Sequence, residues 1–375
     1  MPMEGSTLND PQTAVNYCQV CPKLCNASCP VADADPQEAS TPWGKMTTMK
    51  QVNSGQLPVE DYALAYKCFN CGRSEPSCDL GNPIPETLDH YRSKAFATLV
   101  APKVIYEFCE KFSKFNNPYG KDLKKILHQQ LPKEISDSPK RGVYFPGCTE
   151  INFQAPIIKR TLDFFSELGT YQLGLYQEPI QCCGAPLFLA GDMERFKEMA
   201  EVNSHLLNGY EFIVSSASDC LYTMKSYYAA VGFPIKAKIM TTPSYILPML
   251  KNIWKRTGRQ PMPPMAYHDA CTLGGRRLAV YQEPRELLEL VSGQAPLEFT
   301  ENREHSGCCG DGGLLSLTYP HIAQKVTQMF LEEFHKTGAS LLITTTPSCQ
   351  MRLQKTAPHL AVKGLMEFII DSVKI

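Results

Sequence analysis

The chain contains 375 residues, of which 43% are hydrophobic and 20% are charged, and its formal net charge is −1. This length gives room for two or three globular domains. A charge so close to zero argues against nucleic acid as a main partner, because binding to phosphates requires an excess of basic residues.

The sixteen cysteines indicate metal binding or redox chemistry in the cytoplasm, where thiols stay reduced. The sequence shows neither a signal-peptide core nor an apolar run of the roughly 18 residues that span a bilayer. We therefore expect a cytoplasmic protein that is peripheral to a membrane only through a partner subunit.

Residues 1–135 are expected to form a helical domain. Helical periodicity is visible in Pro42–Gly55 and in Asp61–Cys68, where apolar residues recur every three or four positions. A polar stretch with two prolines, Pro132–Arg141, follows as a candidate linker. Cys109 lies in an apolar helical stretch without a nearby partner, and we interpret it as an ordinary packed thiol.

Two cysteine runs in this domain have the spacing of iron–sulfur ligands. The first lies in residues 18–29 and ends before a proline, and the second lies in residues 68–78. A Cys-x2-Cys step brings two thiolates to one side of a tight turn or helix. In ferredoxins with two clusters, the cysteine that precedes proline binds the other cluster. We therefore predict two crossed ligand sets: Cys18, Cys21, Cys25 and Cys78 in the first, and Cys29, Cys68 and Cys71 in the second.

The second set has only three thiolates, because Ser74 stands where the run would place its third cysteine. One [4Fe–4S] cluster is predicted at the first set. The second site is a [4Fe–4S] cluster with Ser74 or water as its fourth ligand, a [3Fe–4S] cluster, or absent. The alternative is zinc, whose paired Cys-x2-Cys steps usually lie ~15–20 residues apart. Cys21 and Cys68 are much farther apart than that.

Residues 142–258 and 265–375 alternate strand-like and helix-like stretches, which is typical of α/β domains with parallel sheets. The Pro-rich stretch Lys255–Pro264 is a candidate linker between them. Four strand-like runs each end just before a cysteine; they are Gly142–Phe145, Glu211–Ser215, Met265–His268 and Leu341–Thr345, and the cysteines are Cys148, Cys220, Cys271 and Cys349. Because sites in open α/β sheets form beyond the carboxyl ends of strands, we expect a cluster pocket at this edge.

The same four-cysteine frame occurs in both segments: Cys148, Cys182, Cys183 and Cys220, then Cys271, Cys308, Cys309 and Cys349. Neighbouring side chains on a strand point to opposite faces, so the thiols of each Cys-Cys doublet converge only in a turn. A glycine follows each doublet and permits the positive φ that such a turn often needs. A repeated turn of this kind indicates a metal or iron–sulfur site, whereas two buried cysteine pairs that merely pack are the alternative.

These motifs resemble those of the CCG-domain iron–sulfur oxidoreductases. That family includes the heterodisulfide reductase D subunit, the glycolate oxidase iron–sulfur subunit, a lactate-utilisation protein and the C subunit of anaerobic glycerol-3-phosphate dehydrogenase. The N-terminal runs, followed by Thr41–Met46, are similar to its helical ferredoxin domain, and Tyr144–Cys148 is similar to the opening of its first CCG domain. Three further segments are similar to the second CCG domain of that family: Tyr267–Gly274, Pro284–Glu286 and Asn302–Gly313.

The resemblance implies an α + α/β fold, with an N-terminal helical ferredoxin-like domain followed by two tandem CCG domains with parallel sheets. It also implies that the two frames hold one or two further clusters, either [4Fe–4S] or non-cubane. Thr223 and Arg352 stand where family members that cleave disulfides have one more cysteine, which leaves four thiolates in each frame.

The implied function is an iron–sulfur electron-transfer subunit of a multi-subunit oxidoreductase. Electrons would pass between a flavoprotein partner and an acceptor such as a quinone, a membrane subunit or a disulfide, since no flavin motif appears in this chain. Two alternatives are direct reduction of a heterodisulfide or another thiol–disulfide substrate at a CCG cluster, and a zinc-stabilised scaffold.

Two histidines and three arginines lie close to the second frame. We interpret His268 and Asp269 as groups that hydrogen-bond the strand end, with a proton relay that includes His305 as the alternative. The arginines either offset the charge of a cluster or lie at the surface; they are Arg276, Arg277 and Arg303. No catalytic residue is assigned.

Overall fold

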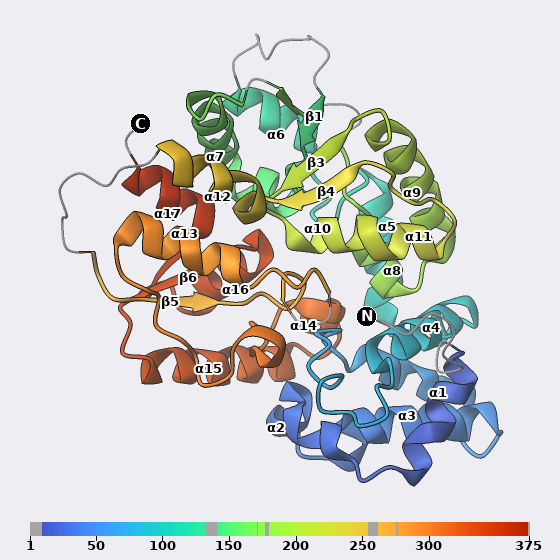
Figure 1. Cartoon of the computed structure of the whole chain (residues 1–375). Coiled ribbons are helices and arrows are strands. Elements are labelled where there is room, and N and C mark those ends of the chain that lie inside the picture. The colour runs from blue at the N-terminus through green and yellow to red at the C-terminus, as the bar shows by residue number, and fades with distance from the viewer. Residues whose placement is uncertain are drawn as a thin grey trace.

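The computed structural model describes residues 10–131, 141–170, 172–176, 180–253, 262–274 and 277–373. The candidate linkers 132–141 and 255–264 lie largely outside these residues, as does Arg276. Figure 1 shows the helices of residues 11–97 beside two α/β parts, which we call the first and second halves (residues 141–253 and 262–373). The helices of residues 103–130 lie with the first half.

The N-terminal part is helical, as predicted. Its elements are α1 (Pro11–Tyr17), η2 (Cys18–Val20), η3 (Leu24–Ser28), α2 (Pro30–Ala34), η4 (Glu38–Ser40), α3 (Pro42–Asn53), η5 (Val59–Tyr66), α4 (Ile84–Ala97), α5 (Lys103–Ser113) and α6 (Leu123–Gln130). Thr41 caps α3 by accepting a hydrogen bond from the N–H of Gly44 at 2.9 Å. The periodic stretch after Asp61 belongs to a 3₁₀ helix and not to an α-helix, although Tyr62, Ala65 and Tyr66 are buried as the period requires.

The first half contains a four-stranded parallel sheet in the order β2-β1-β3-β4. Its elements are β1 (Gly142–Tyr144), α7 (Cys148–Glu167), β2 (Leu173–Leu175), α8 (Ala185–Ala190), α9 (Met193–Leu207), β3 (Phe212–Ser215), α10 (Ser218–Tyr222), η6 (Thr223–Tyr227), α11 (Tyr228–Ala230), β4 (Lys238–Thr241) and α12 (Thr242–Ile253). The two central strands are buried on both faces, which explains why they read as continuous apolar runs.

The second half repeats this topology with the parallel strand order β5-β6-β7. Leu297 forms an isolated parallel bridge to Ala266 of β5, on the edge where the first half has β2. The elements are β5 (Met265–His268), α13 (Gln282–Ser292), η7 (Arg303–His305), η8 (Gly312–Leu314), α14 (Leu315–Thr318), α15 (Pro320–Lys336), β6 (Leu341–Thr344), α16 (Pro347–Thr356), β7 (Ala361–Gly364) and α17 (Leu365–Ser372). The predicted fold class, a helical region followed by two α/β units with parallel sheets, is confirmed.

The N-terminal part packs against both halves. The Tyr66 hydroxyl donates a hydrogen bond to the Ala190 carbonyl oxygen of the first half at 2.7 Å. In the second half, a Cβ placed on Gly312 would lie 2.3 Å from the carbonyl oxygen of Phe69, and one placed on Gly313 would lie 2.0 Å from that of Cys68. Only glycine permits two backbones to approach so closely.

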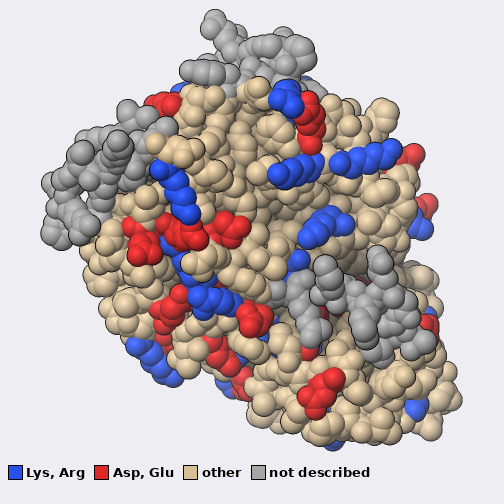
Figure 2. Space-filling model, in the orientation of Figure 1, with Lys and Arg blue, Asp and Glu red and all other residues tan. Residues whose placement is uncertain are grey.

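No helix within the described ranges is both long enough and apolar enough to cross a membrane. On the face drawn in Figure 2, acidic and basic side chains are interspersed and do not form one large patch of either sign. This distribution agrees with the near-zero net charge of the sequence.

The backbone contact at Gly313 yields a testable prediction. Gly313→Ala should destabilise the protein by about 1–3 kcal/mol more than Gly338→Ala, because overpacking adds to the strain of a positive φ. Gly338 is a matched control, since its φ of +73° is close to the +62° of Gly313 while its Cβ would meet nothing within 4 Å. The free energy of unfolding from denaturant titration measures both variants, and equal losses would contradict the close contact.

Candidate iron–sulfur sites

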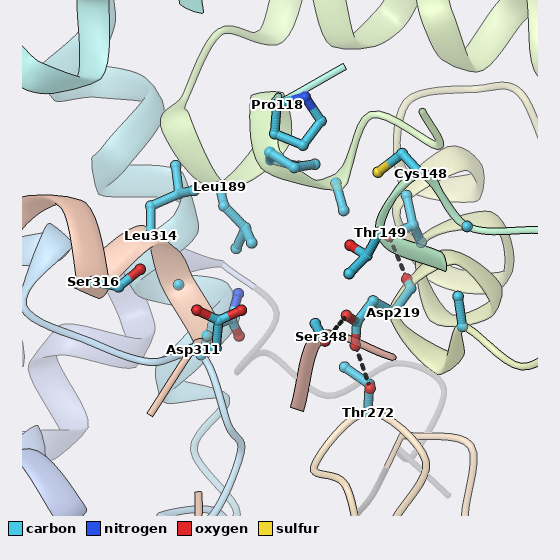
Figure 3. A pocket seen from close by; sticks show the side chains of 18 of the residues that line it. Pro118, Cys148, Thr149, Leu189, Asp219, Thr272, Asp311, Leu314, Ser316 and Ser348 are labelled. Atoms are coloured by element: carbon cyan, nitrogen blue, oxygen red, sulfur yellow. Dashed lines mark hydrogen bonds between the residues drawn. The ribbon is translucent and has the colours of Figure 1, made fainter. Parts of the chain in front are cut away.

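A cavity of about 540 Å³ lies where the N-terminal part and the two halves meet. All eight cysteines of the two frames line it: Cys148, Cys182, Cys183, Cys220, Cys271, Cys308, Cys309 and Cys349. Figure 3 shows Cys148 and Thr149 on one side of this space and Leu314 and Ser316 on the other. Two frames that are distant in the sequence therefore face one shared cavity.

The sheet topology brings these cysteines together. In the order β2-β1-β3-β4, the chain leaves β1 and β3 towards opposite edges, which opens a crevice at the carboxyl ends of these strands. Cys148 follows β1 and Cys220 follows β3, so both lie at this crevice, and β5 and β6 repeat the arrangement. Cys148 is also the first residue of α7.

Each cysteine doublet lies in a turn, as predicted. The glycine after the doublet has a φ of +84° in the first half and +91° in the second. The Sγ atoms of Cys148 and Cys182 are 3.4 Å apart, and those of Cys309 and Cys349 are 3.0 Å apart. The turns therefore bring thiols from distant segments into contact within each half.

Asp219 joins the two halves at the cavity. It accepts hydrogen bonds from the hydroxyls of Thr272 and Ser348, each at 2.7 Å, as Figure 3 shows. Ser218 adds a hydroxyl contact of 2.6 Å to Thr346. Burial raises the pKa of Asp219, because the hydroxyls offset only part of its desolvation. These hydrogen bonds of Ser218 and Asp219 hold the two frames next to each other.

Much of the remaining cavity wall is apolar. It is formed by α5, α8 and the segment from η8 to α14, with the side chains of Val104, Phe108, Leu189, Leu314 and Leu317. Asp311 follows the second doublet and also lines the cavity, and burial raises its pKa to about 7. A largely apolar space with a few polar groups is typical of a small-molecule site.

The first N-terminal set, Cys18, Cys21, Cys25 and Cys78, lies close together. Burial and the neighbouring thiols raise the pKa of Cys18 and of Cys25 to about 12. Asn82 donates from its side chain to the Sγ of Cys18 at 3.2 Å and from its backbone N–H to the Sγ of Cys78 at 3.4 Å. Asn82 thus connects the two cysteine runs, as the crossed assignment requires.

The second N-terminal set lines a separate, smaller cavity. Cys29, Cys68, Cys71 and Ser74 all contribute to its wall, together with the buried Lys45. Ser74 therefore lines the same small cavity as the three thiols. Burial and then the Cys308 thiol raise the pKa of Cys71, which shows that this set adjoins the second frame.

Zinc is the alternative metal for these sets. Among the described residues, no three His, Cys, Asp or Glu side chains are arranged to hold one metal ion. A zinc site requires four ligand atoms at about 2.0–2.3 Å from the metal, which places the sulfurs very close to one another.

The side chains near the second frame have structural partners. His268 is buried, and its two ring nitrogens lie 3.2 Å from Thr344 Oγ1 and 3.3 Å from the carbonyl oxygen of Gly307. Asp269 accepts two hydrogen bonds from Arg285, at 2.8 and 2.7 Å, and one from the backbone N–H of Arg303. The interpretation that His268 and Asp269 hold the strand end is confirmed.

Other predicted residues lie apart from the thiols. His305 is exposed, and the guanidinium of Arg303 donates to Asn302. Cys109 is buried in α5 and does not line either cavity, as expected for a packed thiol. Arg277, in contrast, is buried and lines the large cavity.

Thr223 and Arg352 occupy the places of the missing fifth cysteines. Thr223 donates to the carbonyl oxygen of Asp219 at 2.7 Å, and Arg352 donates from Nε to Thr327 at 3.0 Å. A neutral hydroxyl in one half thus corresponds to a guanidinium in the other.

Three functional candidates escaped the sequence analysis: Asn70, Asn82 and Asp219. Asp219 carried a signal, since it is an acidic residue directly before a cysteine at a strand end. The two asparagines carried none, because hydrogen bonds to sulfur and across domains depend on tertiary contacts.

Comparison with known proteins agrees with this geometry. Residues 143–225 and 265–354 each match the CCG family of cysteine-rich domains. The D subunit of a dihydromethanophenazine:CoB–CoM heterodisulfide reductase from Methanosarcina mazei is 24% identical over 313 residues, which cover 82% of this chain and 76% of that protein.

The B subunit of a CoM/CoB fumarate reductase from Methanothermobacter marburgensis is 23% identical over 340 residues, which cover 88% of this chain but only 66% of that protein. Lactate utilization protein A from Bacillus subtilis is 26% identical over 216 residues, or 56% of this chain and 88% of that protein. Residues 143–225 and 265–354 of this chain are therefore assigned to the cysteine-rich CCG domain, in tandem behind a helical N-terminal part.

Proposed function

We propose that this chain is the iron–sulfur electron-transfer subunit of a multi-subunit oxidoreductase. The observation that carries the proposal is the grouping of fifteen cysteines into two N-terminal sets and one shared cavity, with the second set beside the second frame. Two of the similar proteins are named as subunits of reductases, which supports a role among partner subunits.

Iron–sulfur clusters at these cysteines would supply single-electron transfer when bound. The residues themselves order the sites from the surface inward. Val20, between the first two cysteines of the first set, is 84% exposed, whereas the cysteines of the second doublet are buried. We infer that a flavoprotein partner approaches the first set, and that the apolar cavity receives the acceptor, such as a quinone or a disulfide.

Direct reduction of a disulfide within the cavity is a second candidate. The observation that favours it is that eight thiols line one open space large enough for a small molecule. Thr223 and Arg352 count against it, because each frame lacks the additional thiolate that the resemblance associates with this chemistry. Turnover of a heterodisulfide by the isolated chain with an artificial electron donor would favour this candidate over the first, and intact clusters without turnover would eliminate it.

Iron content is the first test of the proposed function. Protein isolated without oxygen should be brown and contain at least about four irons per chain, because the first N-terminal set alone suits one [4Fe–4S] cluster. Colorimetric iron and sulfide analysis measures this. A colourless protein with stoichiometric zinc would contradict the proposal.

Individual cysteines should separate the sites. Cys183→Ser or Cys309→Ser should remove an electron paramagnetic resonance signal of the shared cavity and leave the N-terminal signals, because each thiol lines only the cavity. Cys109→Ser is the matched control and should leave every signal unchanged. Survival of all signals in both doublet variants would show that the doublets do not hold clusters.

Ser74 should determine the type of the second N-terminal cluster. Ser74→Cys places a fourth thiolate in the small cavity and should yield a [4Fe–4S] signal there with about one additional iron if the native centre is [3Fe–4S]. Ser74→Ala removes the oxygen and should weaken a serine-ligated [4Fe–4S] cluster to [3Fe–4S]. If neither variant changes the spectrum or the iron count, Ser74 is not a ligand and three-iron occupancy is also contradicted.

A further inference from the structure

Arg277 lies between the second N-terminal set and the shared cavity. It is 8% exposed and lines the cavity. Its Nη2 donates to the backbone oxygen of Asn70 at 2.7 Å and to the side-chain Oδ1 of the same residue at 2.8 Å. The guanidinium also lies 4.5 Å from the ring centroid of Tyr222. One side chain of the second half therefore contacts both the Cys68–Cys71 turn and the first half.

The hydrogen bonds of Arg277 described above go to neutral oxygens. Within the described ranges, no carboxylate forms an ion pair with it, and its buried Nε–H has no hydrogen-bond acceptor. Burial opposes the charge of Arg277, but neighbouring groups that include Tyr222, Glu86 and Glu75 outweigh this effect and hold its pKa above the usual range. Because a buried charge is costly unless it is paired, a buried guanidinium without an ion pair favours a further negative group beside it.

Arg92 is a second buried arginine at the Cys68–Cys71 turn, and its charge is paired with a carboxylate. It is also buried, and its Nη2 donates to the carbonyl oxygen of Cys68 at 2.7 Å. Its Nη1, however, pairs with Asp89 Oδ1 at 3.0 Å. The turn therefore contacts two guanidinium groups, of which one is neutralised by a carboxylate and the other is not.

Arg277 adjoins segments that carry thiols of two sets. A Cβ placed on Gly72, the residue after Cys71, would lie 3.5 Å from its Nε, so the guanidinium packs against the backbone of the second N-terminal set. In the second frame, Cys271 and Cys308 line the same cavity as Arg277. A negative cofactor held at either set would supply the missing counter-charge.

We propose that Arg277 is the counter-charge of clusters bound at the second N-terminal set and at the second frame, and that it raises their reduction potentials. The inference rests on the proposed function. A reduced cluster carries one more negative charge than an oxidised one, and a fixed positive charge in a buried site stabilises the reduced state. Arg277 binds no iron; it acts on the ligand sets through its charge and through its position against Asn70.

Arg277→Gln and Arg277→Lys test this role. Gln keeps a hydrogen-bond donor for Asn70 but removes the charge, whereas Lys keeps the charge. The resonance to follow is the one that Cys71→Ser removes. The Gln variant should lower the midpoint potential of this resonance by at least about 59 mV, which is a tenfold change in the equilibrium constant of one-electron reduction. The Lys variant should retain most of the native potential. Redox titration followed by electron paramagnetic resonance measures both.

Arg160→Gln is the matched control, since this arginine is half-exposed and pairs with Asp371 at 2.5 Å far from the thiols. Its loss should leave the potential unchanged. An unshifted Gln variant, equal shifts in the Gln and Lys variants, or loss of the resonance from both would overturn the proposal. Loss of the resonance from the Gln variant alone would support the proposal, because the Lys variant keeps the positive charge and the Gln variant does not. Wild-type protein without iron would instead contradict the proposed function.

Discussion

The contact between the Cys68–Cys71 turn and the Gly312–Gly313 backbone is the constraint on which the order of the sites depends. At this contact the carbonyl oxygens of one segment lie against Cα atoms of the other, with no side chain between them. The second N-terminal set is therefore held directly beside the second doublet. A larger residue at either glycine would separate the two sets.

Asn70 turns this contact into a junction of all three parts. Its φ of +56° is tolerated by asparagine better than by most residues and places its side chain inside the interface. The amide donates to Asp89 at 2.8 Å and to the Tyr227 hydroxyl at 3.1 Å, and its oxygen accepts from Arg277. These hydrogen bonds come from all three parts of the molecule, and together they fix the conformation of the Cys68–Cys71 turn. Electron-transfer sites require such preorganisation.

The two halves repeat one topology but differ in their electrostatics. In the first half, Ala185 and Thr223 occupy the places that Asp311 and Arg352 hold in the second. Arg277 adds a further charge on the side of the second half. The repeat thus supplies two similar cysteine frames around one cavity, and the substitutions give the frame nearest to the N-terminal sets a more strongly charged environment.

The sequence by itself predicted the fold class, the strands that end before cysteines and the turn at each doublet, because these depend on local periodicity and on glycine. It missed β2, β4 and β7, which are short edge strands, and its domain boundaries stay predictions. Only the tertiary structure decided that eight thiols face one cavity, that Ser74 shares a small cavity with three cysteines, and that Arg277 forms no ion pair with a carboxylate of the described residues. These facts concern distances between segments far apart in the chain, and residue spacing carries no information about such distances.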